Sequence, residues 1–144
     1  MIAIMPTPRD FHEKINIRAH ISYEEPMARH TTFRIGGPAE ALVAPANRED
    51  FVRLVEDAEA EGIPAFILGG GANLLVGDRG IRGLVLDTSA LAAIDDGDAK
   101  SEGILVAEAG LSVDSLCEAA RDRGLSGLAT FYGMGYLLLY VYYG

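Results

Sequence analysis

The sequence predicts a mixed α+β fold built around one strand–helix–strand unit. Segments of strand length outnumber helical segments along the chain and do not alternate strictly with them. One amphipathic helical segment lies between two apolar segments of strand length, within about 30 residues. The 144 residues, of which 49% are hydrophobic and 23% charged, are enough to form one hydrophobic core. We therefore expect one globular unit of this class.

The first elements are predicted from Thr31 onward. Residues 31–35 alternate and are rich in β-formers, so they predict a strand that ends at the turn Gly36-Gly37-Pro38. A second strand is expected over 40–44. A helix follows, with Asn47 as its N-cap and Gly62 as its stop. Its buried face is predicted from residues at helical spacing, which are Phe51, Leu54, Val55 and Ala58.

The second half of the chain continues the mixed pattern. Residues 65–68 form a continuous apolar segment, which predicts a strand buried on both faces. Further strands are expected over 83–87 and 104–107. Ser112 is the predicted N-cap of a second helix that stops at Gly124. The buried face of this helix is expected to consist of Val113, Leu116, Cys117 and Ala120.

Composition excludes several classes of protein. The net charge of −9 argues against binding to the nucleic-acid backbone or to an anionic membrane surface, because both require a cationic face. Cys117 is the only cysteine, so no internal disulfide forms and a reducing compartment is permitted. No segment approaches the ~20 apolar residues of a membrane span, and no secretory signal is recognisable. The histidines lack metal-ligand spacing, so no metal is expected. These features predict a cytoplasmic protein.

Three consecutive glycines, 69–71, follow the apolar strand. Without side chains they can turn successive amides toward one point, which is the geometry of an anion-binding nest. Ala72 keeps the wall small, and Asn73 offers an amide to a phosphate or to the loop itself. The loop has neither the Lys of a P-loop nor the third glycine of the dinucleotide fingerprint, whose position Leu74 occupies. From these residues alone, a diphosphate site and a glycine-rich sheet corner remain equal alternatives.

Three motifs in order carry a family resemblance. They are RHTTFRIGGPA at 29–39, ILGGGANLLV at 67–76, and GLSGL at 124–128 followed by FYGM at 131–134. Together they resemble UDP-N-acetylenolpyruvoylglucosamine reductase, also called UDP-N-acetylmuramate dehydrogenase. The resemblance covers Tyr23 to Met134 and corresponds to the N-terminal FAD-binding part of that enzyme.

The resemblance implies a vanillyl-alcohol-oxidase-type FAD-binding fold, in which two small α/β subdomains hold FAD between them. Residues 1–22 would then be an N-terminal extension, 23–134 the FAD-binding domain and 135–144 an atypical apolar tail. A C-terminal substrate domain would be absent from the chain.

The resemblance also assigns residues to the cofactor. The loop that wraps the FAD pyrophosphate would consist of Leu68, Gly69, Gly70, Gly71, Ala72, Asn73 and Leu74. Ala109 and Gly110 would approach the cofactor from the second subdomain, and Gly133 and Met134 would begin the loop along the flavin ring. No residue of this chain is assigned a catalytic role.

The family reaction has two halves. NADPH gives hydride to FAD, and the reduced flavin gives hydride to the enolpyruvyl double bond of a UDP-sugar. This step belongs to peptidoglycan synthesis, and hence to cell-wall formation, cell shape and cell division. The family's serine acid lies beyond the flavin half, so we expect the isolated chain to be inactive.

The last residues depart from the family pattern. The segment Tyr136–Gly144 holds four of the six tyrosines and no charge. It predicts either a strand or helix that packs against another surface or an interrupted version of a longer protein; if exposed, it would favour association of copies of the chain. Two alternatives to the reductase remain open. One is a non-catalytic module that associates through this tail, and the other is a domain that binds a nucleotide-sugar or NAD(P) instead of FAD.

Overall fold

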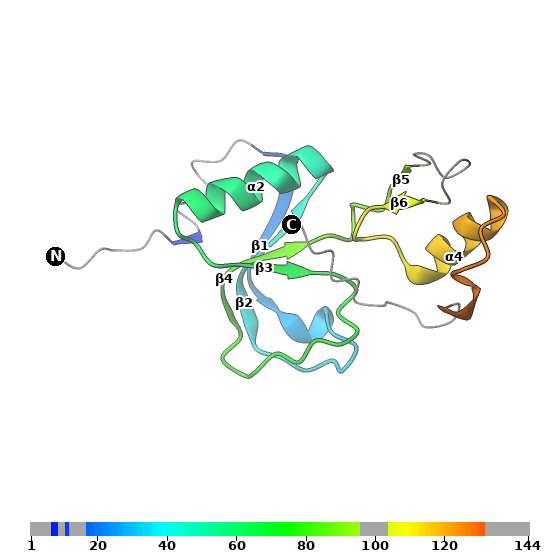
Figure 1. Cartoon of the computed structure of the whole chain (residues 1–144). Helices are drawn as coiled ribbons and strands as arrows, with labels where there is room; N and C mark the ends of the chain where they lie inside the picture. Colours follow the sequence, from blue (N-terminus) through cyan, green and yellow to red (C-terminus); the bar gives the residue numbers. More distant parts are fainter. Residues whose placement is uncertain (1–6, 9–10, 12–16, 96–103, 132–144) are drawn as a thin grey trace.

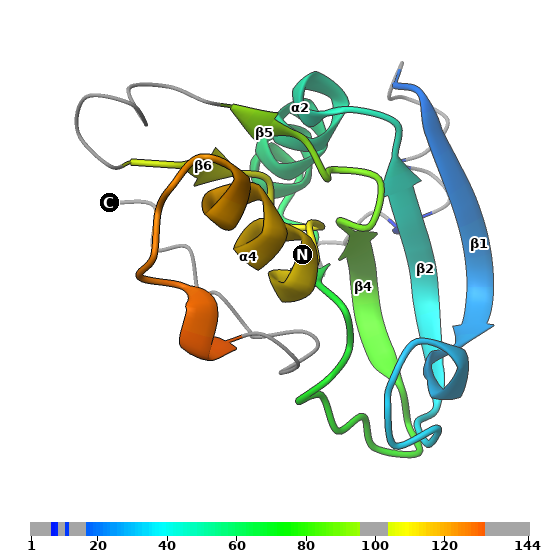
Figure 2. The ribbon, with the colours of Figure 1, turned by 90° about the vertical axis from the view of Figure 1, so that its right-hand side faces the viewer.

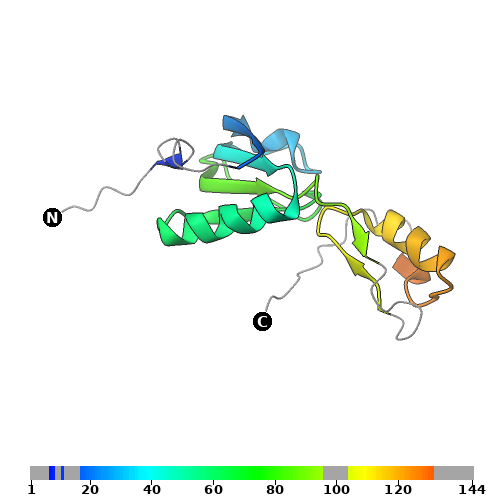
Figure 3. The same cartoon turned by 90° about the horizontal axis from the view of Figure 1, so that it is seen from above.

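The computed structural model describes residues 7, 8, 11, 17–95 and 104–131, which form a larger and a smaller lobe (Figure 1). The larger lobe contains a four-stranded sheet with helix α2 across one face. The smaller lobe contains a two-stranded sheet and helix α4, and the chain enters it directly from the end of β4 (Figure 3). This arrangement confirms the predicted mixed α+β class.

The sheet of the larger lobe has the strand order β1-β2-β4-β3. Its strands are β1 (Ala19–Pro26), β2 (Pro38–Pro45), β3 (Ala65–Leu68) and β4 (Ile81–Asp87). β1 is antiparallel to β2, whereas β4 runs parallel to both β2 and β3. The predicted strand–helix–strand unit is therefore present as β2–α2–β3, with β4 inserted between its two strands.

Helix α2 (Arg48–Ala60) forms where its caps predict it. The Asn47 side chain accepts a hydrogen bond from the backbone amide of Asp50 at 2.8 Å, and Gly62, with φ +68°, follows the last turn. Leu54 and Ala58 are fully buried. They belong to the core between the helix and the sheet, which also contains Phe11, Ala41, Val43, Ile63, Leu84 and Leu86.

A second core lies on the opposite face of the sheet. Successive residues of β4 alternate between the two cores, so Val85 packs here whereas Leu84 and Leu86 face α2. The remaining members are Met27, Ala39, Leu42, Leu68 and Val76. Met27 belongs to the short 3-10 helix η1 (Met27–Arg29). Loops and η1, rather than a long helix, therefore cover this face (Figure 1).

The smaller lobe contains β5 (Ile94–Asp95), β6 (Val106–Ala107), α4 (Val113–Asp122) and the 3-10 helix η2 (Ala129–Phe131). Figure 2 shows α4 beside this two-stranded sheet. The Ser112 side chain accepts a hydrogen bond from the Ser115 amide at 3.1 Å, which confirms the predicted cap. The strand predicted over 104–107 is shorter in the structure, where only Val106 and Ala107 belong to it.

Two sequence expectations about the first strands are wrong. β1 was not predicted, and residues 31–35 do not form a strand. Arg34 has φ +54°, which interrupts an extended chain, and its amide bonds the Thr31 carbonyl at 3.1 Å to close a turn. The Thr31 hydroxyl also donates to the Ile35 carbonyl at 3.0 Å. These local hydrogen bonds compete successfully with the β propensity of the segment.

The burial expected for β3 is also wrong. Of its four residues only Leu68 is buried, whereas Phe66 is 39% and Ile67 56% exposed. β3 pairs only with β4 and is an edge strand. The apolar segment therefore indicates a strand correctly but does not place it inside the sheet.

Candidate functional site

The glycine loop, defined here as residues 69–76, begins where β3 ends. It runs along the sheet face opposite α2, where Leu74 and Val76 pack on the second core. No helix begins in it, as the sequence predicts, so this is neither a P-loop nor a dinucleotide fingerprint.

Two of the glycines have different structural roles. Gly71 has φ +66°, and a Cβ placed on it would lie 1.9 Å from the His30 carbonyl oxygen. At Gly69 a Cβ would meet nothing within 4 Å. Gly71 is therefore required for the close passage of the chain past His30, whereas Gly69 borders open space.

A segment about 40 residues earlier holds the loop in place. The Thr32 backbone amide donates to the Gly71 carbonyl at 3.1 Å, and the Thr32 hydroxyl donates to the Ala72 carbonyl at 2.9 Å. Beyond the loop, the Gly37 amide donates to the Gly77 carbonyl at 3.1 Å. The motifs at 29–39 and 67–76 are thus one structural unit. Thr32 was expected in a strand and was not among the predicted site residues.

The loop's carbonyls and amides are used differently. The carbonyls of Gly71 and Ala72, and that of Leu68 directly before the loop, accept hydrogen bonds from protein donors. Within the described part of the chain, the backbone amides of residues 69–73 donate to no protein acceptor. This pattern fits a main-chain anion site, because such a site needs amides that the protein itself does not use.

The second predicted site segment, Ala109–Gly110, approaches the loop through Thr88, which directly follows β4. Thr88 donates to the Leu68 carbonyl from its backbone amide at 3.0 Å and from its hydroxyl at 3.1 Å. A Cβ on Gly110 would lie 1.9 Å from the Thr88 carbonyl oxygen, and the Gly110 amide donates to the Leu91 carbonyl at 2.8 Å. Thr88 therefore links the start of the glycine loop to the smaller lobe.

The other predicted site residues, Gly133 and Met134, lie outside the described residues, as does the tail Tyr136–Gly144. The Ser112 and Ser115 hydroxyls lie 2.8 Å apart at the start of α4, where they belong to the helix cap. Among residues 7, 8, 11, 17–95 and 104–131, no group of three or more His, Cys, Asp or Glu side chains could hold a metal ion. A recess of about 440 Å³ at the N-terminus of α2 contains none of the predicted site residues.

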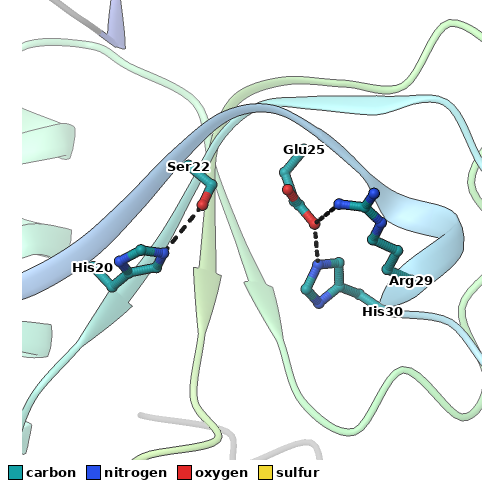
Figure 4. Close-up of polar contacts among 5 residues, drawn as sticks. All are labelled: His20, Ser22, Glu25, Arg29 and His30. Carbon is teal, nitrogen blue, oxygen red and sulfur yellow. Dashed lines mark hydrogen bonds and ion pairs between the residues drawn. The ribbon is translucent and has the colours of Figure 1, made fainter.

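A cluster of polar contacts among Glu25, Arg29 and His30 lies in the segment that precedes Thr32 (Figure 4). His30 Nε2 lies 3.0 Å from Glu25 Oε1, and one guanidinium nitrogen of Arg29 lies 3.5 Å from the same oxygen. The hydrogen bond with His30, with Arg29 beside it, lowers the pKa of the Glu25 carboxyl, against the opposing effect of desolvation. Because the His30 carbonyl packs on Gly71, this cluster supports the base of the glycine loop.

The cluster predicts a pH-dependent contribution to stability. Since the pKa of Glu25 is lowered in the folded state, its stabilisation is complete above the unfolded-state pKa and disappears as pH falls through the folded-state pKa. We expect Glu25→Gln to reduce the free energy of unfolding by about 0.5 to 1 kcal/mol at pH 7 and to have no effect in strong acid. Urea unfolding at several pH values measures this difference. Glu24→Gln is the matched control, because Glu24 is the exposed neighbour; an equal effect in both variants would contradict the prediction.

Comparison with known proteins identifies the family of the chain. The family model described as "FAD binding domain" matches residues 39–132. UDP-N-acetylenolpyruvoylglucosamine reductase from Desulfosudis oleivorans is 41% identical over 119 residues, which are 81% of this chain and 38% of that protein. The chain thus spans less than half the length of this curated relative.

Solved structures show the same fold. The reductase MurB from Thermus caldophilus matches with a TM-score of 0.55 and 28% identity, over 83% of this chain and 39% of that one. The flavoenzyme CrmK matches with a TM-score of 0.58 and 18% identity, over 77% of this chain and 23% of that one, which supports the fold alone. The predicted FAD-binding fold of vanillyl-alcohol-oxidase type is confirmed. The chain belongs to the family of FAD-binding domains and is similar to the N-terminal, FAD-binding part of UDP-N-acetylenolpyruvoylglucosamine reductases.

Proposed function

We propose that the chain binds FAD and that backbone amides of residues 69–73 hold its diphosphate. The observation that carries this proposal is a division among these backbone groups. The carbonyls of Gly71, Ala72 and the preceding Leu68 accept hydrogen bonds from the protein, while the amides of residues 69–73 donate to no described acceptor. Gly71 allows the backbone to pass close to the His30 carbonyl, and at Gly69 the loop borders open space. The loop contains no Lys or Arg, so main-chain donors would supply the interaction.

The smaller lobe would complete the cofactor site. Ala109–Gly110 supports this because its turn packs on Thr88, next to the start of the loop. Gly133 and Met134 are proposed for the flavin side on the family resemblance. Bound FAD supplies hydride-transfer chemistry, and this chain's residues bind and orient it.

The wider function rests on the relatives. We infer that the chain is the FAD-binding portion of a UDP-N-acetylmuramate dehydrogenase, with NADPH and an enolpyruvyl UDP-sugar as co-substrate and substrate, in the cytoplasmic synthesis of peptidoglycan precursors. The support is 41% identity to one such reductase over 81% of the chain. Because the match spans only 38% of that relative, we expect the isolated chain to bind the cofactor without turning over the UDP-sugar. In the described part of the chain, no helix is long and apolar enough to cross a bilayer.

Titration with FAD tests the proposal, with flavin fluorescence and absorbance as readouts. The wild-type chain should bind FAD in preference to NADP or a UDP-sugar, titrated separately. Gly70→Glu should weaken FAD binding by about 100-fold or more, because a side chain and a negative charge would enter the anion site.

Gly77→Glu is the matched control for this substitution. Gly77 is exposed, its Cβ position meets nothing within 4 Å, and it lies just beyond the same loop. We expect its affinity for FAD to stay near that of the wild type. A wild-type chain that takes up no FAD, or a Gly70→Glu chain that binds it normally, would overturn the proposal.

A further inference from the structure

We propose that Thr32 and Thr88 are positioning residues that aim the amides of the glycine loop. Each threonine uses both its backbone N–H and its hydroxyl to hold carbonyls on the protein side: Thr88 holds that of Leu68, directly before the loop, and Thr32 holds those of Gly71 and Ala72 within it. This inference rests on the proposed FAD function and adds the two residues that would pre-organise the diphosphate site.

Thr88 controls the first peptide of the loop. Its amide and its hydroxyl both donate to the Leu68 carbonyl, at 3.0 and 3.1 Å, so they can use both lone pairs of that oxygen. In a planar trans peptide the C=O and the following N–H point in opposite directions. With the Leu68 carbonyl held toward Thr88, the Gly69 amide points away from Thr88 and therefore away from β4.

Thr32 fixes the orientation of two further peptides, Gly71–Ala72 and Ala72–Asn73. Its amide holds the Gly71 carbonyl at 3.1 Å, and its hydroxyl holds the Ala72 carbonyl at 2.9 Å. By the same planarity, the amides of Ala72 and Asn73 point away from Thr32. The two threonines, 56 positions apart in the sequence, thus fix the orientation of three amides that donate to no described acceptor.

The two residues differ in burial, which sets the expected size of their effects. Thr88 is 1% exposed, so its hydroxyl bond is shielded from water, whereas Thr32 is exposed and water competes for its bond. The Thr88 carbonyl also contacts Gly110 of the smaller lobe. Thr88 is therefore placed to keep both proposed FAD-contacting segments in register.

Thr31 provides an internal control. It is a buried threonine next to Thr32, but its hydroxyl donates to the Ile35 carbonyl instead of to the glycine loop. Thr31→Val removes a hydroxyl of the same kind from the same segment, so it reports on general destabilisation. Thr32→Ser and Thr88→Ser keep the hydroxyl and test whether the hydrogen bond is the feature that matters.

The experiment measures the FAD dissociation constant of the full chain, beside urea unfolding without FAD. We expect Thr88→Val to raise the dissociation constant by about tenfold and Thr32→Val by about threefold to fivefold. Thr31→Val and both serine variants should stay within about twofold of the wild type. In the apo chain, 15N relaxation should show greater mobility of the amides of residues 69–73 in Thr32→Val and Thr88→Val and not in Thr31→Val.

The outcomes separate this inference from the function on which it depends. A wild-type chain without FAD affinity overturns the proposed function and this inference with it. A wild-type chain that binds FAD while Thr88→Val and Thr32→Val bind it equally well overturns the inference alone. It is also overturned if Thr31→Val weakens binding as much as the other two, or if the serine variants do not restore affinity.

Discussion

Replacing Gly71 with alanine is expected to be the most damaging single-methyl change in the glycine loop. Gly71 has φ +66°, which an L-residue adopts at a cost of about 1 to 2 kcal/mol. The added Cβ would also lie 1.9 Å from the His30 carbonyl oxygen and 3.3 Å from the Thr31 Cα. These contacts are backbone atoms, so the chain must shift to relieve them, and we expect a total loss of about 3 kcal/mol or more.

Urea or thermal unfolding measures the stability of Gly71→Ala, and FAD titration measures its affinity. The shift would displace the segment that contains Thr32, so FAD binding should also be strongly reduced. Gly69→Ala is the control for stability, since a Cβ there meets nothing within 4 Å and its φ lies outside the left-handed region. A Gly71→Ala chain as stable as Gly69→Ala would show that the loop does not pass His30 as described.

Replacing Gly110 with alanine should move the turn of the smaller lobe away from β4 and lower the affinity for FAD. Its Cβ would lie 1.9 Å from the Thr88 carbonyl oxygen and 2.8 Å from that of Leu91. Because both contacts are backbone, the turn after β6 must move away from β4, at a cost of about 2 to 3 kcal/mol. The movement takes Ala109–Gly110 away from the glycine loop, so we expect FAD affinity to fall by about tenfold or more.

Gly127→Ala is the matched control for Gly110→Ala. Gly127 lies in the same lobe and is exposed, and a Cβ there meets nothing within 4 Å. Its unfolding free energy should change by no more than about 0.5 kcal/mol, and its FAD affinity should not change. Equal FAD affinity in Gly110→Ala and Gly127→Ala would argue against a role for this turn in the cofactor site.

The sequence predicts those parts of the fold that depend on local interactions. Both long helices begin at the caps predicted for them, because Asn47 and Ser112 bond amides only three residues ahead. β1 was missed because its pattern is only partly alternating and its strand character comes from pairing with β2. β3 was recognised, but its place at the sheet edge depends on the insertion of β4 between β2 and β3.

The candidate site divides in the same way. The glycine loop could be recognised because three glycines after a strand are rare and have a local meaning. Thr32 and Thr88 could not, since each acts through hydrogen bonds to a loop that lies 20 to 40 positions away in the sequence. A strand was wrongly predicted over 31–35, because the residue types there favour strands and do not indicate the positive φ of Arg34.

The central claim is that backbone amides of the glycine loop hold the FAD diphosphate, and NMR titration of the 15N-labelled chain tests it most directly. On addition of FAD, the amide resonances of residues 69–73 should show the largest shifts and a marked slowing of hydrogen exchange, and Gly77 should change little. If FAD binds while those five amides keep their shifts and exchange rates, the diphosphate is held elsewhere and the account is contradicted.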